Sequence, residues 1–254
     1  MLDKINVSAV SYLNTAPFVY GLKHAEIKNS INLSLDYPSE CARKVISGES
    51  DMGLVPLASI INKDEFKIIT DYCIGAKEKV RTVSLLSNSP IEEIDTIYLD
   101  YHSITSVTLI KVLAKHLWKK SIVWRPFGPM NSIDQLLPSH GIVAIGDKVF
   151  GLESKFKMNY DLANEWNALT GLPMVFAIWT TKQELDISFL EGFNNALRYG
   201  LERIALSVEF HGNKIVSKND AENYLTKNIS FSLNEKKKES INVFSDLAKE
   251  FLAK

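Results

Sequence analysis

Hydrophobic and polar positions follow one another along this chain in a strand–helix–strand order. Short apolar runs and period-two alternation predict strands, whereas apolar residues spaced three and four apart predict amphipathic helices. The predicted strands are residues 4–10, 31–37, 51–56, 80–87, 96–100, 121–127, 141–147 and 173–181. The predicted helices are residues 18–23, 40–47, 103–117, 131–137, 161–169 and 186–208. This order is typical of an α/β protein with mostly parallel sheets.

The two halves of the chain share one layout of strand, polar loop, helix, strand, helix and strand. Segments 80–87 and 173–181 lie where the chain would cross between the halves. We therefore predict a two-lobed fold, with lobe 1 formed by residues 1–86 plus 177–254 and lobe 2 by residues 87–176. A ligand cleft is expected between the lobes, where strand ends and helix starts converge. A single α/β sheet is the alternative.

Hydroxyl residues surround the predicted helix start near residue 103. Ser103, Thr105 and Ser106 lie there, and the first turn has no carboxylate. A helix N-terminus has unpaired N–H groups and a partial positive charge, so it can receive an anion. An ordinary Ser or Thr cap uses the same residues and is the alternative.

A second polar loop occupies the matching place in the first half. Ser11, Tyr12, Asn14 and Thr15 follow a predicted strand and precede a helix. The Asn14 amide is both donor and acceptor, which suits a substrate hydroxyl or carboxylate. A turn stabilised by the same side chains is the alternative. The two loops together favour a ligand site.

Further polar candidates lie at the expected edges of the cleft. Thr82 and Ser84 share one face of an extended segment and would be donors for a polar ligand. Arg81 could hold a carboxylate through two hydrogen bonds, or form a surface ion pair. Asp147 ends a predicted strand and could act as an acid, hold a hydroxyl or cap the next turn.

Composition narrows the class of protein. The chain has 254 residues, 46% of them hydrophobic, and a net charge of −1, which gives no indication of nucleic-acid or membrane-surface binding. Its apolar runs are too short to span a bilayer, and its start does not resemble a signal peptide. Cys41 and Cys73 are far apart, and no metal-ligand spacing occurs. We expect a cytoplasmic protein without a metal; its oligomeric state stays open.

Six segments in order carry a resemblance to a known family over about residues 4–200. They are VSYLNTAPF, SGESDMGLVPLASI, DYCIGAKEKVRTVSLLS, LDYHSITSVTLIKVL, AIGD and EWNALTGLPMVFAIW. The sequence resembles the chorismate dehydratases of the futalosine route of menaquinone biosynthesis. The resemblance implies a type II periplasmic-binding-protein-like fold and conversion of chorismate to 3-[(1-carboxyvinyl)oxy]benzoate with loss of water. It also implies no metal or organic cofactor.

The candidate residues suit this chemistry. Two polar helix starts could hold the two carboxylates of chorismate, and the aromatic product supplies the driving force, so the protein mainly needs to orient the substrate. The base is predicted to be a substrate carboxylate or Asp147, with Asn14 holding the hydroxyl or a carboxylate. The alternatives are a 1,4-dihydroxy-6-naphthoate synthase of the same pathway and a cytosolic or transport-associated binding protein for a small organic anion.

Overall fold

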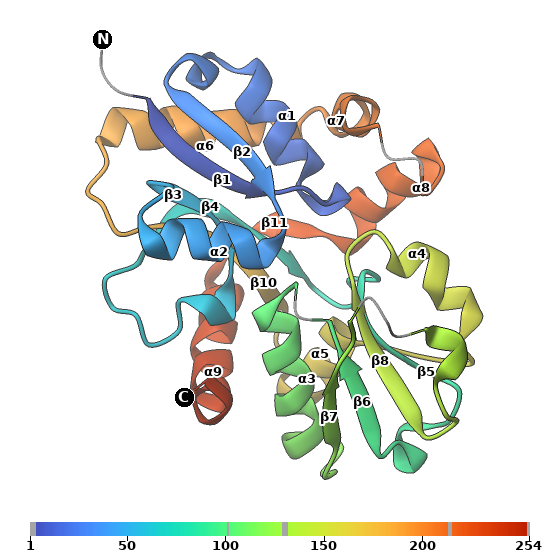
Figure 1. Ribbon diagram of the computed structural model, residues 1–254. Coiled ribbons are helices and arrows are strands. Elements are labelled where there is room, and N and C mark those ends of the chain that lie inside the picture. Colours follow the sequence, from blue (N-terminus) through green and yellow to red (C-terminus); the bar gives the residue numbers. More distant parts are fainter. Residues whose placement is uncertain (1–3, 101, 129–131, 213–214, 253–254) are drawn as a thin grey trace.

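Two mixed β-sheets, each covered by helices, form the two lobes of the protein (Figure 1). The computed structural model describes residues 4–100, 102–128, 132–212 and 215–252. Within these residues, no helix is both long enough and apolar enough to cross a membrane. The predicted two-lobed α/β architecture is confirmed.

The first sheet has six strands, which include the first and the last strand of the chain. In sheet order they are β11 (Ser230–Ser232), β4 (Lys67–Ala76), β10 (Met174–Thr181), β3 (Met52–Pro56), β1 (Ile5–Val10) and β2 (Ile31–Asp36). Strand β1 runs parallel to β2 and β3, whereas β10 runs antiparallel to both β3 and β4.

The second sheet has five strands. In sheet order they are β7 (Val123–Pro126), β6 (Thr96–Leu99), β8 (His140–Ile145), β5 (Val83–Ser87) and β9 (Met158–Asp161). Strand β6 is parallel to β7 and β8, and β5 is antiparallel to β8 and β9. The prediction of mostly parallel sheets is therefore wrong. Strands β5 and β10 follow the two crossings. Each lies between two strands of its new sheet and runs antiparallel to both.

The strand positions locate the two crossings between the lobes. The chain leaves the first sheet after Ala76 and joins the second at Val83, and it returns to the first sheet at Met174. Residues 83–86 therefore pair in the second sheet and residues 174–176 in the first, a few positions before the predicted limits at 86 and 177. The division of the whole chain into these two lobes stays a prediction.

Helices cover both sheets. They are α1 (Ala16–His24), α2 (Pro38–Ser47), α3 (Ile104–His116), α4 (Val149–Leu152), α5 (Leu162–Thr170), α6 (Ile187–Leu201), α7 (Ile204–His211), α8 (Lys218–Asn223) and α9 (Glu235–Leu252). Short 3-10 turns are η1 (Leu13–Thr15), η2 (Glu26–Asn29), η3 (Leu57–Ser59), η4 (Ile91–Glu93), η5 (Ile133–Gln135) and η6 (Glu153–Lys155). A π-helical turn, η7, covers Tyr224–Asn228.

Two helix predictions need correction. The predicted helix 186–208 is two helices, because Arg203 leaves helical geometry at φ −131° and ψ 44° between α6 and α7. Of the predicted helix 131–137, Asn131 lies outside the described residues, and the rest forms only the turn η5. There Ser132 accepts a hydrogen bond from the Asp134 N–H, and the chain becomes extended at Leu136.

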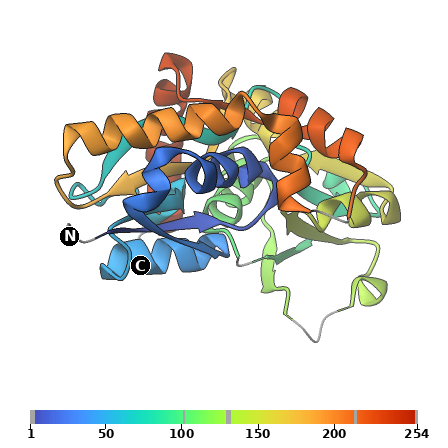
Figure 2. The same ribbon diagram turned by 90° about the horizontal axis from the view of Figure 1, so that it is seen from above.

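The packing of α1 sets the position of the polar loop that precedes it. Figure 2 shows α1 beside α6 on one face of the first sheet and α2 on the other face. Helices α1 and α6 approach closely at Gly21 and Gly200, where a Cβ atom on Gly200 would lie 1.7 Å from the Pro17 carbonyl oxygen. Only glycine permits this contact between backbones. Helix α1, and the loop joined to it, is thereby fixed against the core.

The C-terminal segment connects the two lobes. Strand β11 pairs with β4 in the first sheet. Helix α9 then packs against α3 and β10, and its Ser240 hydroxyl accepts a hydrogen bond of 3.0 Å from the Trp166 indole N–H of α5. The buried Lys237 ammonium of α9 donates to the Ser232 carbonyl at 2.7 Å, which holds the helix on the sheet edge.

Candidate active site

A cavity lies between the two lobes. About 50 Å³ of the cavity is accessible to a water-sized sphere, which is less than the roughly 300–1,000 Å³ that is typical of small-molecule sites. The lining residues are Val10, Tyr12, Asn14, Thr15, Pro38, Pro56, Ile74, Val80, Thr82, Val83, Ser103, Ser106, Ile145, Gly146, Phe176 and Ala177. They come from both sheets and from both crossings, so the cavity exists only when the two lobes are together.

The first-lobe wall is the turn between β1 and α1. The Thr15 hydroxyl donates to the carbonyl oxygens of Val10 and Tyr12 at 2.5 and 2.7 Å, which holds the turn in shape. The Asn14 carbonyl oxygen is buried and has no hydrogen-bond partner among the described residues. Buried polar atoms are normally paired, so an unpaired amide oxygen on a cavity wall indicates a place for a ligand donor.

The second-lobe wall is the start of α3. Ser103 is the N-cap residue, and its hydroxyl accepts hydrogen bonds from the Ser106 N–H at 3.5 Å and the Ser106 hydroxyl at 3.3 Å. The first turn of α3 carries no acidic residue. Ser103 is thus a helix cap, as the alternative expected, and both serines also line the cavity.

Thr105 lies in the same helix turn but does not line the cavity. Its side chain is buried, and its hydroxyl accepts a hydrogen bond of 3.1 Å from the Ala58 N–H of η3. A helix turns by about 100° per residue, so Thr105 points away from the direction shared by Ser103 and Ser106. Its contact joins the two lobes.

Two more predicted site residues lie outside the cavity lining. Ser11 is exposed, and its carbonyl oxygen lies 3.4 Å from His211 Nε2. Ser84 is fully buried in β5, between β8 and β9, opposite Ala144 and Asp161. The Ser84 hydroxyl has no hydrogen-bond partner among the described residues.

Asp147 connects the lobes without lining the cavity. Both of its carboxylate oxygens accept a hydrogen bond from the Leu13 N–H, at 3.1 and 3.2 Å. Burial raises the pKa of Asp147, and the bond from Leu13 opposes this rise. The carboxylate therefore holds the turn that carries Asn14, one residue away from Leu13.

Thr82 and Arg81 have different surroundings. Thr82 lines the cavity, and its hydroxyl oxygen lies 2.6 Å from the Tyr224 hydroxyl. The Arg81 guanidinium pairs with Glu153 at 2.8 Å and lies over the Phe150 ring, 4.9 Å from its centre. Arg81 is therefore engaged in a partly exposed ion pair, which was the alternative to a carboxylate clamp.

Tyr12 closes the cavity between the lobes. Its ring packs on Gly146, where a Cβ atom would lie 2.9 Å from the ring. Burial and the nearby Asp100 carboxylate raise the pKa of Tyr12, so its phenol stays uncharged at neutral pH. Asp100 itself is buried and pairs with His102 and Lys148. The Asp100 carboxylate therefore has the Lys148 ammonium as its counter-charge.

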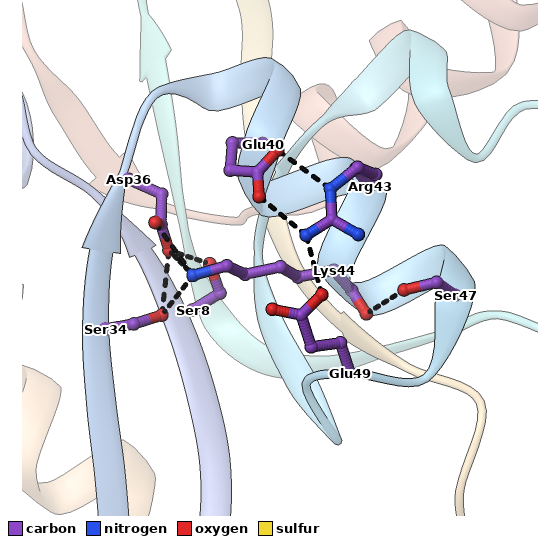
Figure 3. A network of polar contacts seen from close by, with 8 residues as sticks. All are labelled: Ser8, Ser34, Asp36, Glu40, Arg43, Lys44, Ser47 and Glu49. Atoms are coloured by element: carbon purple, nitrogen blue, oxygen red, sulfur yellow. Dashed lines mark hydrogen bonds and ion pairs between the residues drawn. The ribbon is translucent and has the colours of Figure 1, made fainter.

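A network of polar contacts fixes the segment that brings Pro38 to the cavity (Figure 3). The Asp36 carboxylate, at the end of β2, accepts hydrogen bonds from the Lys44 ammonium at 2.8 and 2.9 Å and from the Ser8 and Ser34 hydroxyls. Burial disfavours the charge on Asp36, but these donors outweigh it and lower its pKa. The network ties α2, through Lys44 in its last turn, to β1 and β2.

The cavity lining carries no full charge. Among the lining residues there is no Asp, Glu, Lys, Arg or His. Elsewhere in the described part of the chain, no group of three or more His, Cys, Asp or Glu side chains is placed to hold a metal ion. The site can offer hydroxyls, an amide and helix N–H groups, set against the apolar walls of Val10, Ile74 and Phe176.

Sequence reasoning missed most of the apolar walls, and it missed Tyr224. Pro38, Pro56, Ile74 and Val80 come from segments that are distant along the chain, and nothing in their local pattern marks them as cavity residues. Tyr224 lies in a helical stretch with no motif. A short apolar strand end followed by proline, as at Pro56, was the one available signal.

The fold and cavity define a class: two-lobed α/β proteins that enclose a small molecule between their lobes. Solved structures of low identity share the fold. The protein AF1704 from Archaeoglobus fulgidus has a TM-score of 0.76 at 14% identity, covering 98% of this chain and 97% of that one. The periplasmic aliphatic sulphonate binding protein SsuA from Escherichia coli has a TM-score of 0.66 at 12% identity, covering 100% and 95%. The expected periplasmic-binding-protein-like fold is confirmed.

The family is narrower than this class. Residues 5–250 match the family described as menaquinone biosynthesis, and the chain belongs to it. A curated relative, the chorismate dehydratase of Thermus thermophilus, is 25% identical in an alignment of length 213 that covers 76% of this chain and 76% of the relative.

Proposed function

We propose that this protein is a chorismate dehydratase that forms 3-[(1-carboxyvinyl)oxy]benzoate and water. Membership of the menaquinone biosynthesis family and the activity named for the Thermus thermophilus relative support this reaction. The observation that carries it is the cavity between the lobes, lined by uncharged hydroxyl and amide groups around apolar walls.

The cavity has groups for each part of the substrate. Chorismate has two carboxylates, a hydroxyl and a non-aromatic ring. The start of α3, with Ser103 and Ser106, provides N–H groups and hydroxyls for a carboxylate, aided by the helix dipole. Phe176 and Ile74 provide flat and aliphatic surface for the ring. Asn14 and Thr82 face the same space from the other side.

The proposed reaction is an elimination. The C–H bond at the ether-bearing ring carbon breaks, and its electron pair becomes a ring double bond as the neighbouring C–O bond breaks. The departing hydroxide takes up a proton and leaves as water, and the ring becomes aromatic. This change is redox-neutral, so the proposal includes no cofactor. The protein contributes orientation and hydrogen bonding to the leaving hydroxyl.

We propose a substrate carboxylate as the base. The two predicted candidates were a substrate carboxylate and Asp147. The cavity lining has no acidic side chain, and the Asp147 carboxylate is turned toward the Leu13 N–H. A carboxylate of the bound substrate is already beside the ring and needs only to be held in the correct direction. We also propose that the protein acts in the cytoplasm, where a biosynthetic enzyme of this family would meet its substrate.

The test is direct incubation with chorismate. We expect chorismate to disappear and an aromatic product, lighter by one water, to form, measured by ultraviolet absorbance and mass spectrometry. Chorismate decays slowly by itself, so a sample without protein is the control. Tight binding of chorismate without turnover would overturn the proposal and favour a binding protein for small organic anions.

A further inference from the structure

One buried carboxylate holds the end of the first crossing between the lobes. Asp161 ends β9, is the N-cap residue of α5 and is 8% exposed. Its Oδ1 atom accepts hydrogen bonds from the Ala163 and Asn164 N–H groups at 3.0 and 3.2 Å, as a helix cap does. The same carboxylate accepts from the crossing, where the Val80 N–H donates to Oδ1 at 3.1 Å and the Arg81 N–H to Oδ2 at 2.6 Å. Asp161 therefore joins α5 to the crossing.

The two oxygens of this carboxylate have different tasks. A helix cap needs one side-chain oxygen, and Oδ1 provides it. The hydrogen bond found for Oδ2 within the described part of the chain comes from the Arg81 N–H, and its length of 2.6 Å is that of a bond to a charged acceptor. A capping asparagine would satisfy α5 equally well. The second oxygen is therefore explained by the crossing and not by the helix.

The bend at Arg81 needs such a partner. Its φ of 67° lies in the left-handed region, which residues other than glycine rarely adopt and which persists only where the surroundings hold it. The next residue, Thr82, lines the cavity together with Val80 and Val83. The bond from the Arg81 N–H to Asp161 therefore restrains the path of the chain just before a cavity residue.

Thr82 has a hydroxyl that can reach a ligand. Its oxygen lies 2.6 Å from the Tyr224 hydroxyl oxygen. A threonine hydroxyl has one hydrogen and two lone pairs, so it can bond Tyr224 and a polar group in the cavity at the same time. Asp161 is outside the cavity lining and can act on a ligand only through the residues that it holds.

We infer that Asp161 is a positioning residue: through the Arg81 N–H it holds the crossing so that the Thr82 hydroxyl hydrogen-bonds the ligand in the cavity. The identity of that ligand, chorismate, rests on the proposed function. The hold on Thr82 rests only on the contacts of Asp161. Thr82 lies away from any charged group of the cavity wall and would bond the substrate equally before and during reaction, so its loss should appear in KM more than in kcat.

The decisive variant is Asp161→Asn. Its amide keeps one oxygen for the α5 cap and places an NH₂ group where Oδ2 accepted from the Arg81 N–H, so two donors face each other. We expect KM for chorismate to rise about tenfold, the effect of losing one well-placed hydrogen bond, with kcat changed less than about twofold. Asp186→Asn is the matched control, because Asp186 caps α6 through the Ser188 N–H at 2.8 Å and lies outside the cavity lining. We expect it to retain the wild-type KM.

A double variant tests whether Asp161 acts through Thr82. Thr82→Val removes the hydroxyl and keeps the shape of the side chain, and we expect it to raise KM about tenfold. Once this hydroxyl is absent, adding Asp161→Asn should change KM by less than about twofold. A merely structural role would make the two effects multiply to roughly 100-fold, and that result would overturn the inference.

A measurement without turnover tests the position of Thr82 itself. The Thr82 methyl signal in the NMR spectrum of threonine-labelled protein is assigned by its loss in Thr82→Val. We expect this signal to shift in Asp161→Asn and to stay in place in Asp186→Asn. If Asp161→Asn does not fold, Asp161→Ser, which also caps a helix with one oxygen, takes its place. An unshifted Thr82 signal, or the wild-type KM, in a folded Asp161 variant would overturn the inference. If the wild-type protein does not consume chorismate, the proposed function fails, and the methyl signal still decides whether Asp161 positions Thr82.

Discussion

The two polar walls that face each other across the cavity are built in different ways. The start of α3 is local: Ser103 accepts from Ser106, three residues further along the same helix turn. The wall that carries the turn before α1 depends on distant segments, because Leu13 donates to Asp147 of the other lobe and the Thr82 hydroxyl contacts Tyr224 of the C-terminal segment. One wall can form as soon as its helix forms. The other takes its shape only when both lobes and the C-terminal segment have come together.

This difference separates two kinds of mutational effect. Changes in the assembled wall should act on turnover, since they alter the direction of a side chain without unfolding an element. Changes in the networks that fix an element should act mainly on stability, and changes in the local wall should act on stability and, through the lost hydroxyl, on KM. The four variants below test this division, from the largest expected effect to the smallest.

Asn14→Ala should lower kcat about 100-fold, or about 2.7 kcal/mol, because it removes the acceptor from the assembled wall. The measurement is steady-state turnover of chorismate. Asn32→Ala is the matched control. The one hydrogen bond found for the Asn32 side-chain amide is donated to the exposed Asn6 side chain. Unchanged turnover in Asn14→Ala would remove Asn14 from the site.

Lys44→Met should destabilise the fold by roughly 1–2 kcal/mol, since it leaves the largely buried Asp36 carboxylate without its cation. Denaturant unfolding measures the loss. Arg43→Met is the control from the same helix, because Arg43 pairs with Glu40 and Glu49 at the surface (Figure 3). We expect Arg43→Met to lower the free energy of unfolding much less than Lys44→Met does.

The Asp36–Lys44 ion pair should make the stability of the fold depend on pH. The pKa of Asp36 is lowered in the folded protein from its ordinary value of 3.8. Its contribution to stability is therefore complete above pH 3.8 and is lost as the pH falls through the folded-state value. The difference in stability between wild type and Lys44→Met should shrink below pH 3.8. A constant difference down to pH 2 would contradict the role given to the pair.

Ser103→Ala should destabilise the protein by about 1 kcal/mol through loss of the α3 cap, as found for other helices. Thermal or denaturant unfolding measures this loss. Ser103→Gly is the control, because glycine at a cap costs only a few tenths of a kcal/mol. A 100-fold fall in kcat without a change in stability would show that this wall is not simply a local structure.

Asp147→Asn should have the smallest effect, at most about fivefold in kcat. The asparagine oxygen still accepts from the Leu13 N–H, and a neutral acceptor costs about 1 kcal/mol relative to a charged one. Steady-state kinetics with chorismate measure it. Removal of a general base costs 10²–10⁴-fold, so a fall of about that size would make Asp147 the base.

Local pattern predicted most of the elements that position the site. The apolar run of β1, the start of α3 at Ser103 and the end of α2 at Gly48, where φ is 82°, follow from rules that act within a few residues. Strands β4, β9 and β11 were missed; β9 and β11 have only four and three residues, which are too few to show a period. The direction of β5 and β10 was also missed, since alternation is the same in parallel and antiparallel strands.

The predicted site residues also divide into some that line the cavity and some that do not. Ser103 and Ser106 were found from a helix start, and both line the cavity. Thr105, between them, was included with its neighbours, but the helix turn directs it to Ala58 instead. Ser84 was expected in the cleft with Thr82, yet it lies at full burial inside the second sheet. Spacing along the chain gives residue types and periods, but it does not give the packing partner on each side.

The sequence by itself determined the α/β alternation, the two polar helix starts and the family resemblance, because each depends on neighbours within one element or on motifs in order. Only the tertiary structure decided that Asp147 holds the Leu13 turn and that Tyr224 reaches Thr82. Those contacts join segments whose meeting depends on the packing of whole lobes. No short-range rule of propensity or charge contains that packing.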